Sequence, residues 1–254
     1  MKKTIVIMAL LMLVFSSCSN MERKEKKLVE AMQSDDFETA SQAFTDFCEW
    51  LKNDQSTMTY DFKLMREQFG MNQLTSKDGN LRFYSWITND NPTAPLYANV
   101  VQWKSGEDFV GYSGPLNNML NSHKKDASKN KEMTHSIDTI IDIKVNNQPV
   151  YLVVQSHMKS DGKKRSFISA LTIQQVLLTR LPFFFDGTEV AGNLDYENNG
   201  NIKVGDLYKW DEKSNRLLVY QTDDNFHVIP NQYTVLQLEN GRMNRVEPAT
   251  EINQ

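Results

Sequence analysis

Residues 195–206 place oxygen-bearing side chains at the spacing that can wrap a chain around Ca²⁺. A glycine at the sixth position and an isoleucine at the eighth fit the same pattern. A glutamate at the third position, an aspartate in place of the bidentate glutamate at the twelfth, and flanks without helical periodicity depart from it. A plain loop between two strands, with an Asn-Gly turn, explains the same residues. The candidate calcium ligands are Asp195, Glu197, Asn199 and Asp206.

The other residues that could do chemistry do not form a catalytic set. The four histidines are scattered singly, without the i, i+2 or i, i+4 spacing that builds a zinc site on one element. Ser156 and Lys159 have the spacing of a lysine-activated serine, but the same spacing recurs elsewhere in this chain. Carboxylate pairs such as Asp138 and Asp142 act as glycosidase acids only at a defined separation. We therefore assign no catalytic residue and expect no cofactor.

Three tryptophans on expected strands, Trp86, Trp103 and Trp210, are the remaining candidates for ligand binding. Side chains along a strand alternate between core and solvent. A row of exposed rings would suit stacking on a sugar or contact with a protein partner. Filling of the hydrophobic core is the alternative interpretation of the same residues.

The N-terminus has the composition of an export signal. Two lysines at positions 2 and 3 precede an apolar run over residues 5–15. Such a run fits the roughly 7–15 residues of a signal-peptide core and is shorter than the ~20 residues of a membrane-spanning helix. Two serines, small enough for a peptidase to accommodate, then lead to Cys18, whose thiol can be lipidated.

The segment Phe15-Ser16-Ser17-Cys18 resembles the lipobox of bacterial lipoproteins, with Phe15 in place of the usual leucine. The resemblance implies diacylglycerol attachment to Cys18, cleavage before it and N-acylation. Three acyl chains exceed the two signals that stable anchoring requires. We predict that residues 1–17 are a signal peptide and that the mature chain stays on a membrane. An ordinary secretory peptide that carries a cysteine is the alternative.

The residues after Cys18 bear on localisation. In many bacteria a serine at this place directs a lipoprotein to the outer membrane, and Ser19 is such a residue. Surface-exported lipoproteins of the Bacteroidota carry an acidic stretch next, whereas residues 22–27 here are net basic. We expect the outer membrane, facing the periplasm. Residues 78–86 are also similar to segments of uncharacterised envelope lipoproteins from Bacteroidales, a resemblance that covers one hairpin and the overall plan and implies no activity.

Length and charge narrow the function classes. Removal of residues 1–17 from the 254-residue chain would leave 237 residues, enough for one large domain. The formal net charge would shift from −4 to about −6, because two lysines would be lost. A mildly acidic chain with interspersed signs lacks the basic surface of a nucleic-acid-binding protein. With the thiol of Cys18 lipidated, no second thiol would be left to pair with Cys48, so no intramolecular disulfide could form, and the place of Cys48 on an apolar helix face predicts burial.

Residues 18–70 are expected to form a tether and a helical segment. The charged run at 19–27 reads as a tether or as a first helical turn. Asp35 and Glu38 have the spacing of a capping box, which predicts a helix start. Apolar residues at three- and four-residue spacing over 37–51 predict the strongest helix of the chain.

Residues 71–246 are expected to form an antiparallel β domain, because the apolar period changes to two and turn residues recur about every ten residues. Asp78-Gly79 and Asn240-Gly241 mark two hairpin turns, and 186–201 reads as a loop. Short strands without interleaved helices predict a β-sandwich or an open barrel, with a small irregular β-propeller as the alternative. Residues 247–254 are expected to fray.

A specific anchor in a chain without a catalytic set leads to one functional expectation. We expect a lipid-anchored cell-envelope protein that serves as a binding or assembly module. Its partners would be the membrane, through the N-terminal lipid, and an envelope protein or a glycan, but not nucleic acid. An envelope hydrolase acting on glycan or peptidoglycan is the alternative.

Overall fold

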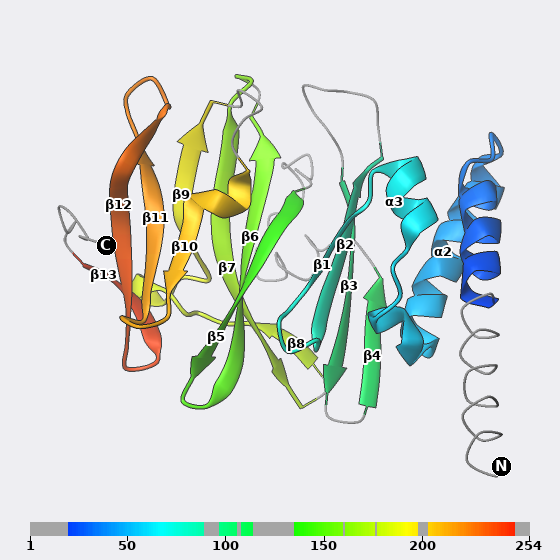
Figure 1. Ribbon diagram of the computed structural model, residues 1–254, viewed down its shortest axis with the longest axis horizontal. Coiled ribbons are helices and arrows are strands. Elements are labelled where there is room, and N and C mark those ends of the chain that lie inside the picture. Colours follow the sequence, from blue (N-terminus) through cyan, green and yellow to red (C-terminus); the bar gives the residue numbers. More distant parts are fainter. Residues whose placement is uncertain are drawn as a thin grey trace, which may run out of the picture.

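The computed structural model describes residues 20–88, 97–105, 108–113, 135–159, 161–175, 177–197 and 203–246. One layer of helices and three antiparallel sheets lie in a row (Figure 1). Strands account for 51% of the structure and helices for 26%, so the predicted mainly β fold with an N-terminal helical segment is confirmed. The predicted signal peptide, Cys18 and residues 247–254 lie outside the described residues.

The helical layer comprises the chain up to residue 70. Residues 20–32 form a helix, here called the N-terminal helix, so that residues 20–27 are helical and not a tether. It is followed by α2 (Phe37–Asn53), a short 3-10 helix η1 (Gln55–Met58) and α3 (Lys63–Phe69). None of the described helices combines the length and the apolar composition needed to cross a bilayer.

The start of α2 differs from the prediction by one residue. Its N-cap is Asp36, whose carboxylate accepts hydrogen bonds from the backbone N–H and the hydroxyl of Thr39. Asp35, the predicted cap, precedes it. Two adjacent aspartates offer the same side chain, and only the backbone conformation decides which one caps the helix. The predicted apolar stripe is buried at its C-terminal part, including Cys48 as expected, whereas its first residue, Phe37, is 82% exposed.

The three sheets are built from strands in sequence order. The first sheet contains β1 (Asn72–Thr75), β2 (Leu81–Ile87), β3 (Tyr97–Ser105) and β4 (Asp108–Ser113). The second contains β5 (Ser136–Val145), β6 (Gln148–Met158), β7 (Lys164–Gln174), β8 (Leu177–Arg180) and β9 (Val190–Tyr196). The third contains β10 (Tyr208–Asp211), β11 (Arg216–Thr222), β12 (Val228–Glu239) and β13 (Arg242–Val246). Two 3-10 turns, η2 (Phe185–Gly187) and η3 (Val204–Leu207), complete the described elements.

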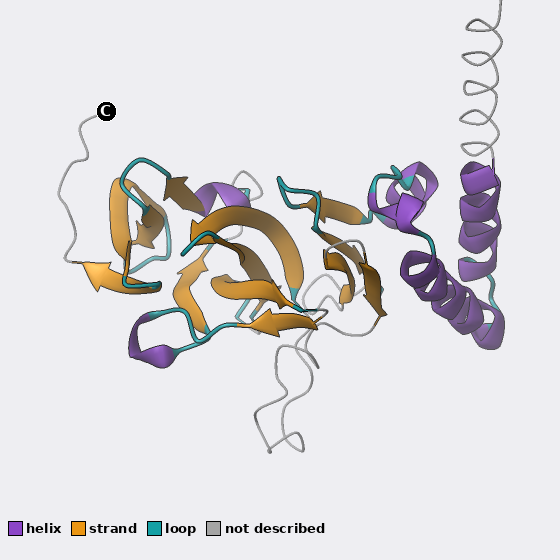
Figure 2. Cartoon of the chain, turned by 90° about the horizontal axis from the view of Figure 1, so that it is seen from below, coloured by secondary structure: helices purple, strands orange, loops and turns teal. Residues whose placement is uncertain are grey.

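The sheets form an open, layered sandwich. Within the described ranges no sheet closes into a barrel, and the sheets follow one another in a row and do not surround a central axis (Figures 1 and 2). One predicted loop needs correction, because residues 186–201 contain β9, which pairs with β7. This strand escaped the sequence analysis since its small and polar residues, such as Gly192 and Asn193, give a weak strand signal.

Three hydrophobic cores fill the spaces between the four layers. We call them the helix–sheet core, the inner core between the first and second sheets, and the outer core between the second and third. On β6, Leu152 and Val154 belong to the outer core, whereas Tyr151 and Val153 belong to the inner core. A sheet covered on both faces needs apolar residues at successive positions, which explains the continuous apolar run of this strand.

Candidate functional site

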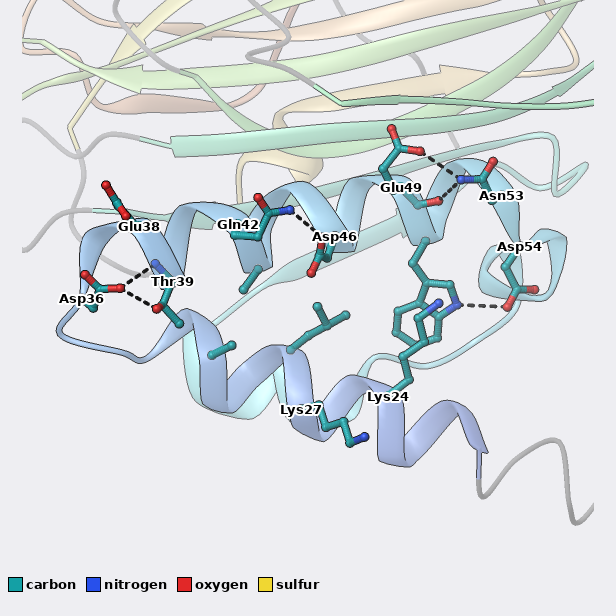
Figure 3. Close-up of a pocket in the computed structure, with 14 residues that line it drawn as sticks. Lys24, Lys27, Asp36, Glu38, Thr39, Gln42, Asp46, Glu49, Asn53 and Asp54 are labelled. Atoms are coloured by element: carbon teal, nitrogen blue, oxygen red, sulfur yellow. Dashed lines mark hydrogen bonds between the residues drawn. The ribbon is translucent and has the colours of Figure 1, made fainter.

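The candidate site is a groove between the N-terminal helix and α2 (Figure 3). Its volume is about 1130 Å³, and its lining extends along α2 from Asp36 to Asp54. Leu28, Ala31 and Ala43 supply apolar surface where the two helices approach each other. The groove therefore follows the length of α2 and has an apolar floor where the two helices approach each other.

A buried carboxylate fixes the N-terminal helix in place. Glu25 is only 1% exposed. One of its oxygens accepts a hydrogen bond from the backbone N–H of Met65, in the first turn of α3, at 2.9 Å, and the other accepts one from the hydroxyl of Tyr60 at 2.8 Å. Since α3 has no side-chain cap of its own, Glu25 supplies that cap from another helix. Leu28 and Val29 add apolar contacts in the helix–sheet core.

The α2 wall of the groove is acidic. Five acidic residues and two basic ones line the groove, which gives it a net negative charge. Asp46 accepts a hydrogen bond from Gln42 at 2.8 Å, and Glu49 accepts one from Asn53 at 3.0 Å. At one end, the hydrogen bond from the Thr39 hydroxyl holds the pKa of the N-cap Asp36 below its usual value. These internal bonds order the carboxylates along the exposed side of α2.

At the other end of the groove, the Trp50 ring contacts a cation. The indole N–H of Trp50 donates to the carboxylate of Asp54 at 3.0 Å, and the ammonium of Lys24 lies 4.5 Å from the ring centroid. Burial lowers the pKa of Lys24, although the carboxylates of Asp54 and Asp46 act in the opposite direction. For Asp54, burial raises the pKa, but the hydrogen bonds from Ser56 and Trp50 outweigh it and leave the value lowered.

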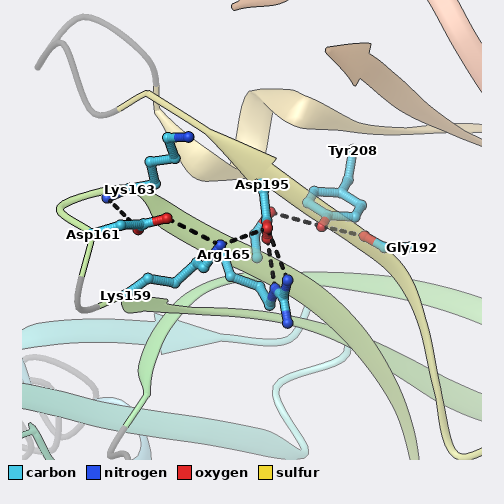
Figure 4. A network of polar contacts seen from close by, with 8 residues as sticks. Lys159, Asp161, Lys163, Arg165, Gly192, Asp195 and Tyr208 are labelled. Carbon is cyan, nitrogen blue, oxygen red and sulfur yellow. Dashed lines mark hydrogen bonds and ion pairs between the residues drawn. The ribbon is translucent and has the colours of Figure 1, made fainter. Parts of the chain in front are cut away.

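The predicted calcium ligands do not converge where the structure describes them. Asp195 lies on β9, where Arg165 contacts both of its oxygens and Lys159 contacts one at 2.9 Å (Figure 4). The hydrogen bonds from Arg165, with those from Lys159, lower the pKa of Asp195 to about 2. Calcium would have to displace both cations to reach this carboxylate.

The other members of the predicted calcium loop lie apart from this contact. Glu197 is 3.2 Å from His227, and Asp206 belongs to η3. Asn199 lies outside the described residues. Among the residues that the structure places, no group of three or more histidine, cysteine or acidic side chains could hold a metal ion. Calcium binding in this loop stays a prediction.

The three candidate tryptophans lie in or against three different cores, so they do not form a row of exposed rings, and the core-filling interpretation fits them. Trp86 is 9% exposed and lies in the helix–sheet core, while Trp103 is 3% exposed and lies in the inner core. Trp210 packs partly buried against the outer core. Because both faces of the first sheet are covered, its tryptophans fill cores on either side.

One polar cluster that the sequence analysis did not assemble lies at the start of β5. The hydroxyl of Ser136 lies 3.0 Å from one oxygen of Asp138 and 2.9 Å from the hydroxyl of Ser156. The second oxygen of Asp138 and the hydroxyl of Tyr196 make no hydrogen bond to any described residue. Burial raises the pKa of Asp138 to about 6. Nearby, the rings of His135 and His157 meet edge to face at 4.8 Å, so these two histidines are not isolated.

One side of the groove was detectable in the sequence as a helical pattern of polar residues. The polar side chains that face it on α2 recur at helical spacing, on the side opposite to the apolar stripe: Glu38, Gln42, Asp46, Glu49 and Asn53. The spacing alone describes an ordinary solvated face. The groove exists because the N-terminal helix lies beside α2 (Figure 3), with the buried Ala43 and Trp50 facing it, which is a tertiary contact.

Comparison with known proteins supplies no family for this arrangement. No family model matches the chain, and neither the curated proteins nor the solved structures give a match.

Proposed function

We propose that this protein is a lipid-anchored cell-envelope module that binds or assembles with a partner through the groove between the N-terminal helix and α2. The observation that carries the proposal is the groove itself, an apolar floor with an acidic wall on the layer next to Cys18. Asn20, the first described helical residue, is two residues from Cys18. Two residues of extended chain reach at most ~7 Å, so a lipid on Cys18 would hold this layer at the membrane surface.

The outer membrane, facing the periplasm, is the location we propose for this module. The support is in the sequence alone: Ser19 follows Cys18, and the charged run after it is net basic. In that setting the groove would meet partners at the inner leaflet surface of the outer membrane. The three sheets would extend from this layer toward the periplasm.

The anchor has a direct chemical test. Cells that express the native chain are grown with a labelled fatty acid, and the label is followed on the protein. Cys18→Ala should abolish the label, because no other residue is proposed to carry the lipid. Cys48→Ala is the matched control and should retain the label, since this thiol is buried. Label that persists in Cys18→Ala would refute the anchor.

The groove is tested by affinity purification of the full-length protein from membranes, with mass spectrometry of what co-purifies. Asp46→Lys reverses a charge in the middle of the acidic wall and should remove the partner. Lys213→Glu reverses an exposed charge next to β10, in the third sheet, and should leave the partner bound. A partner that is lost in both variants, or in neither, would show that the groove is not its binding surface.

The alternative, an envelope hydrolase acting on glycan or peptidoglycan, has one observation in its favour. Asp138 has the raised pKa of a general acid. Purified protein is incubated with dye-labelled peptidoglycan, and Asp138→Asn is the comparison. We expect no release of dye by either protein. Release by the native protein that Asp138→Asn abolishes would replace the binding proposal with a hydrolase.

A further inference from the structure

The contact between Lys24 and Trp50 has the composition of a cation-binding subsite. The ammonium lies 4.5 Å from the ring centroid, and Asp54, which accepts the indole N–H, orients the ring. A ring face combined with carboxylates is a recurrent way for proteins to recognise ammonium and guanidinium groups. Here the cation comes from the chain itself, from the helix that forms the opposite wall of the groove.

The contact is not one that the fold depends on. Lys24 is an exposed residue, whereas the same helix is held by the buried Glu25, Leu28 and Val29. A side chain in that position can be displaced without undoing the helix packing.

Resting on the proposed function of the groove, we propose that Lys24 is a placeholder in this subsite and that the natural occupant is an arginine or lysine of a basic partner segment. The segment would lie along α2 with its apolar side chains on the groove floor and its cations toward the acidic wall. Arginine suits the subsite better than lysine, because a planar guanidinium stacks on an indole and is more weakly hydrated. Lys24 would then swing out and leave the Trp50 ring to the partner.

The length of the groove supports a peptide segment as the occupant. The α2 helix has 17 residues, which corresponds to a length of roughly 25 Å. The lining runs from the N-cap Asp36 to the C-cap Asp54, so the groove follows α2 over that whole length. A helix of about four to five turns, or an extended segment of about eight residues, would cover it, whereas a single small cation would occupy only the subsite.

The test measures binding of a synthetic probe to the full-length protein in nonionic detergent. The probe is a fluorescein-labelled, alanine-based peptide with arginines at helical spacing, and the matched probe carries citrulline, which is neutral, at each arginine. The native protein should bind the arginine peptide on the order of tenfold more tightly than the citrulline peptide. Lys24→Ala should tighten binding of the arginine peptide about two- to fivefold.

Two variants separate a placeholder from an ordinary surface charge. Lys26→Ala removes a lysine of the same helix that pairs with Glu30 outside the groove, and it should bind like the native protein. Lys24→Gln also removes the ammonium but keeps more of the aliphatic stem than Lys24→Ala does. It should therefore also tighten binding of the arginine peptide, and it controls for any loosening of the N-terminal helix by the smaller alanine. Thermal melting of each variant checks that the fold is retained.

The outcomes distinguish this inference from the function it rests on. Binding of the arginine peptide that is unchanged or weakened in both Lys24 variants would overturn the placeholder, and so would equal binding of the two peptides. Neither result touches the groove proposal if a native partner is still lost in Asp46→Lys. If the native partner still bound to Asp46→Lys while the arginine peptide bound as expected, the subsite would stand and the proposed function would be refuted.

Discussion

The helix–sheet core and the outer core hold their layers together in different ways. The helix–sheet core is rich in rings that meet edge to face, such as Phe47 with Phe62 and Phe62 with Tyr84. Polar side chains of the first sheet cross the same boundary. Arg82 donates hydrogen bonds to the carbonyls of Thr57 and Tyr60, both at 2.8 Å.

The outer core is mainly aliphatic. Leu152, Val154 and Ile168 of the second sheet face Leu217 and other apolar residues of the third sheet. Aliphatic burial is non-directional and tolerates repacking, whereas edge-to-face rings and hydrogen bonds require one orientation. The helical layer, and the groove on it, is therefore held in one defined orientation. The second and third sheets are held together mainly by non-directional burial of apolar side chains.

The largest effect should come from a volume-conserving change at the directional boundary. Gln102 is fully buried; it donates to the carbonyl of Leu51 and the hydroxyl of Thr57, and it accepts from Tyr84. Gln102→Leu would remove these three buried hydrogen bonds and should lower the free energy of unfolding by about 3 kcal/mol. Urea denaturation measures it.

The matched control for this substitution is Gln155→Leu. Gln155 is also a buried glutamine, but its amide donates to a single side chain, Ser169. Its loss should cost about 1 kcal/mol. Equal losses in the two variants would mean that burial of the amide, and not the cross-layer hydrogen bonds, determines the cost.

The second effect concerns a titratable group among the sheets, the carboxyl of Asp138. In the folded protein its pKa is about 6, whereas an unfolded chain releases the proton at about pH 4. Between these values the folded state binds more proton than the unfolded state, so the contribution of Asp138 to stability falls as the pH rises from about 4 to about 6. The loss should amount to roughly 2 to 3 kcal/mol.

Asp138→Asn isolates this contribution, since it keeps the shape of the side chain and removes the titration. Urea denaturation of both proteins on either side of the window gives the difference. The stability of Asp138→Asn relative to the native protein should increase as the pH rises from about 4 to about 6 and should stay constant at higher pH. A difference that does not change with pH would contradict the buried, proton-linked carboxyl.

The smallest effect should come from a volume-conserving change in the outer core. Leu152 is fully buried on β6. Leu152→Met changes shape but hardly changes volume, and it should cost less than about 1.5 kcal/mol. A loss as large as that of Gln102→Leu would erase the contrast between the two cores, because the aliphatic boundary would then be as demanding as the directional one.

The sequence predicted local features well and tertiary ones poorly. The Asp78-Gly79 and Asn240-Gly241 turns and the apolar stripe of α2 were readable, because each depends on neighbouring residues. The cap that Glu25 provides to α3 joins residues 40 positions apart, and no local sequence pattern predicts it. The short strand β9 was missed since tertiary burial, and not its own composition, makes it a strand.

The candidate site shows the same limit. The polar side of α2 was visible as periodic polar residues, but a groove also requires a second helix packed beside it. Trp86 and Trp103 were readable as aromatic strand residues, yet only the stacking of layers decides that they are core. Asp195 was readable as a ligand type, whereas its contacts with Arg165 and Lys159 depend on the pairing of β7 with β9.

Cross-linking in intact cells tests directly whether the groove on the helical layer contacts a partner in the envelope. A photo-reactive amino acid is placed at Gln42, an exposed residue of the groove, and in a second strain at Lys213, in the turn between β10 and β11. The proposed function predicts one discrete cross-linked species from position 42 that disappears with Asp46→Lys, and none from position 213. No species from position 42, or the same species from both positions, would contradict it.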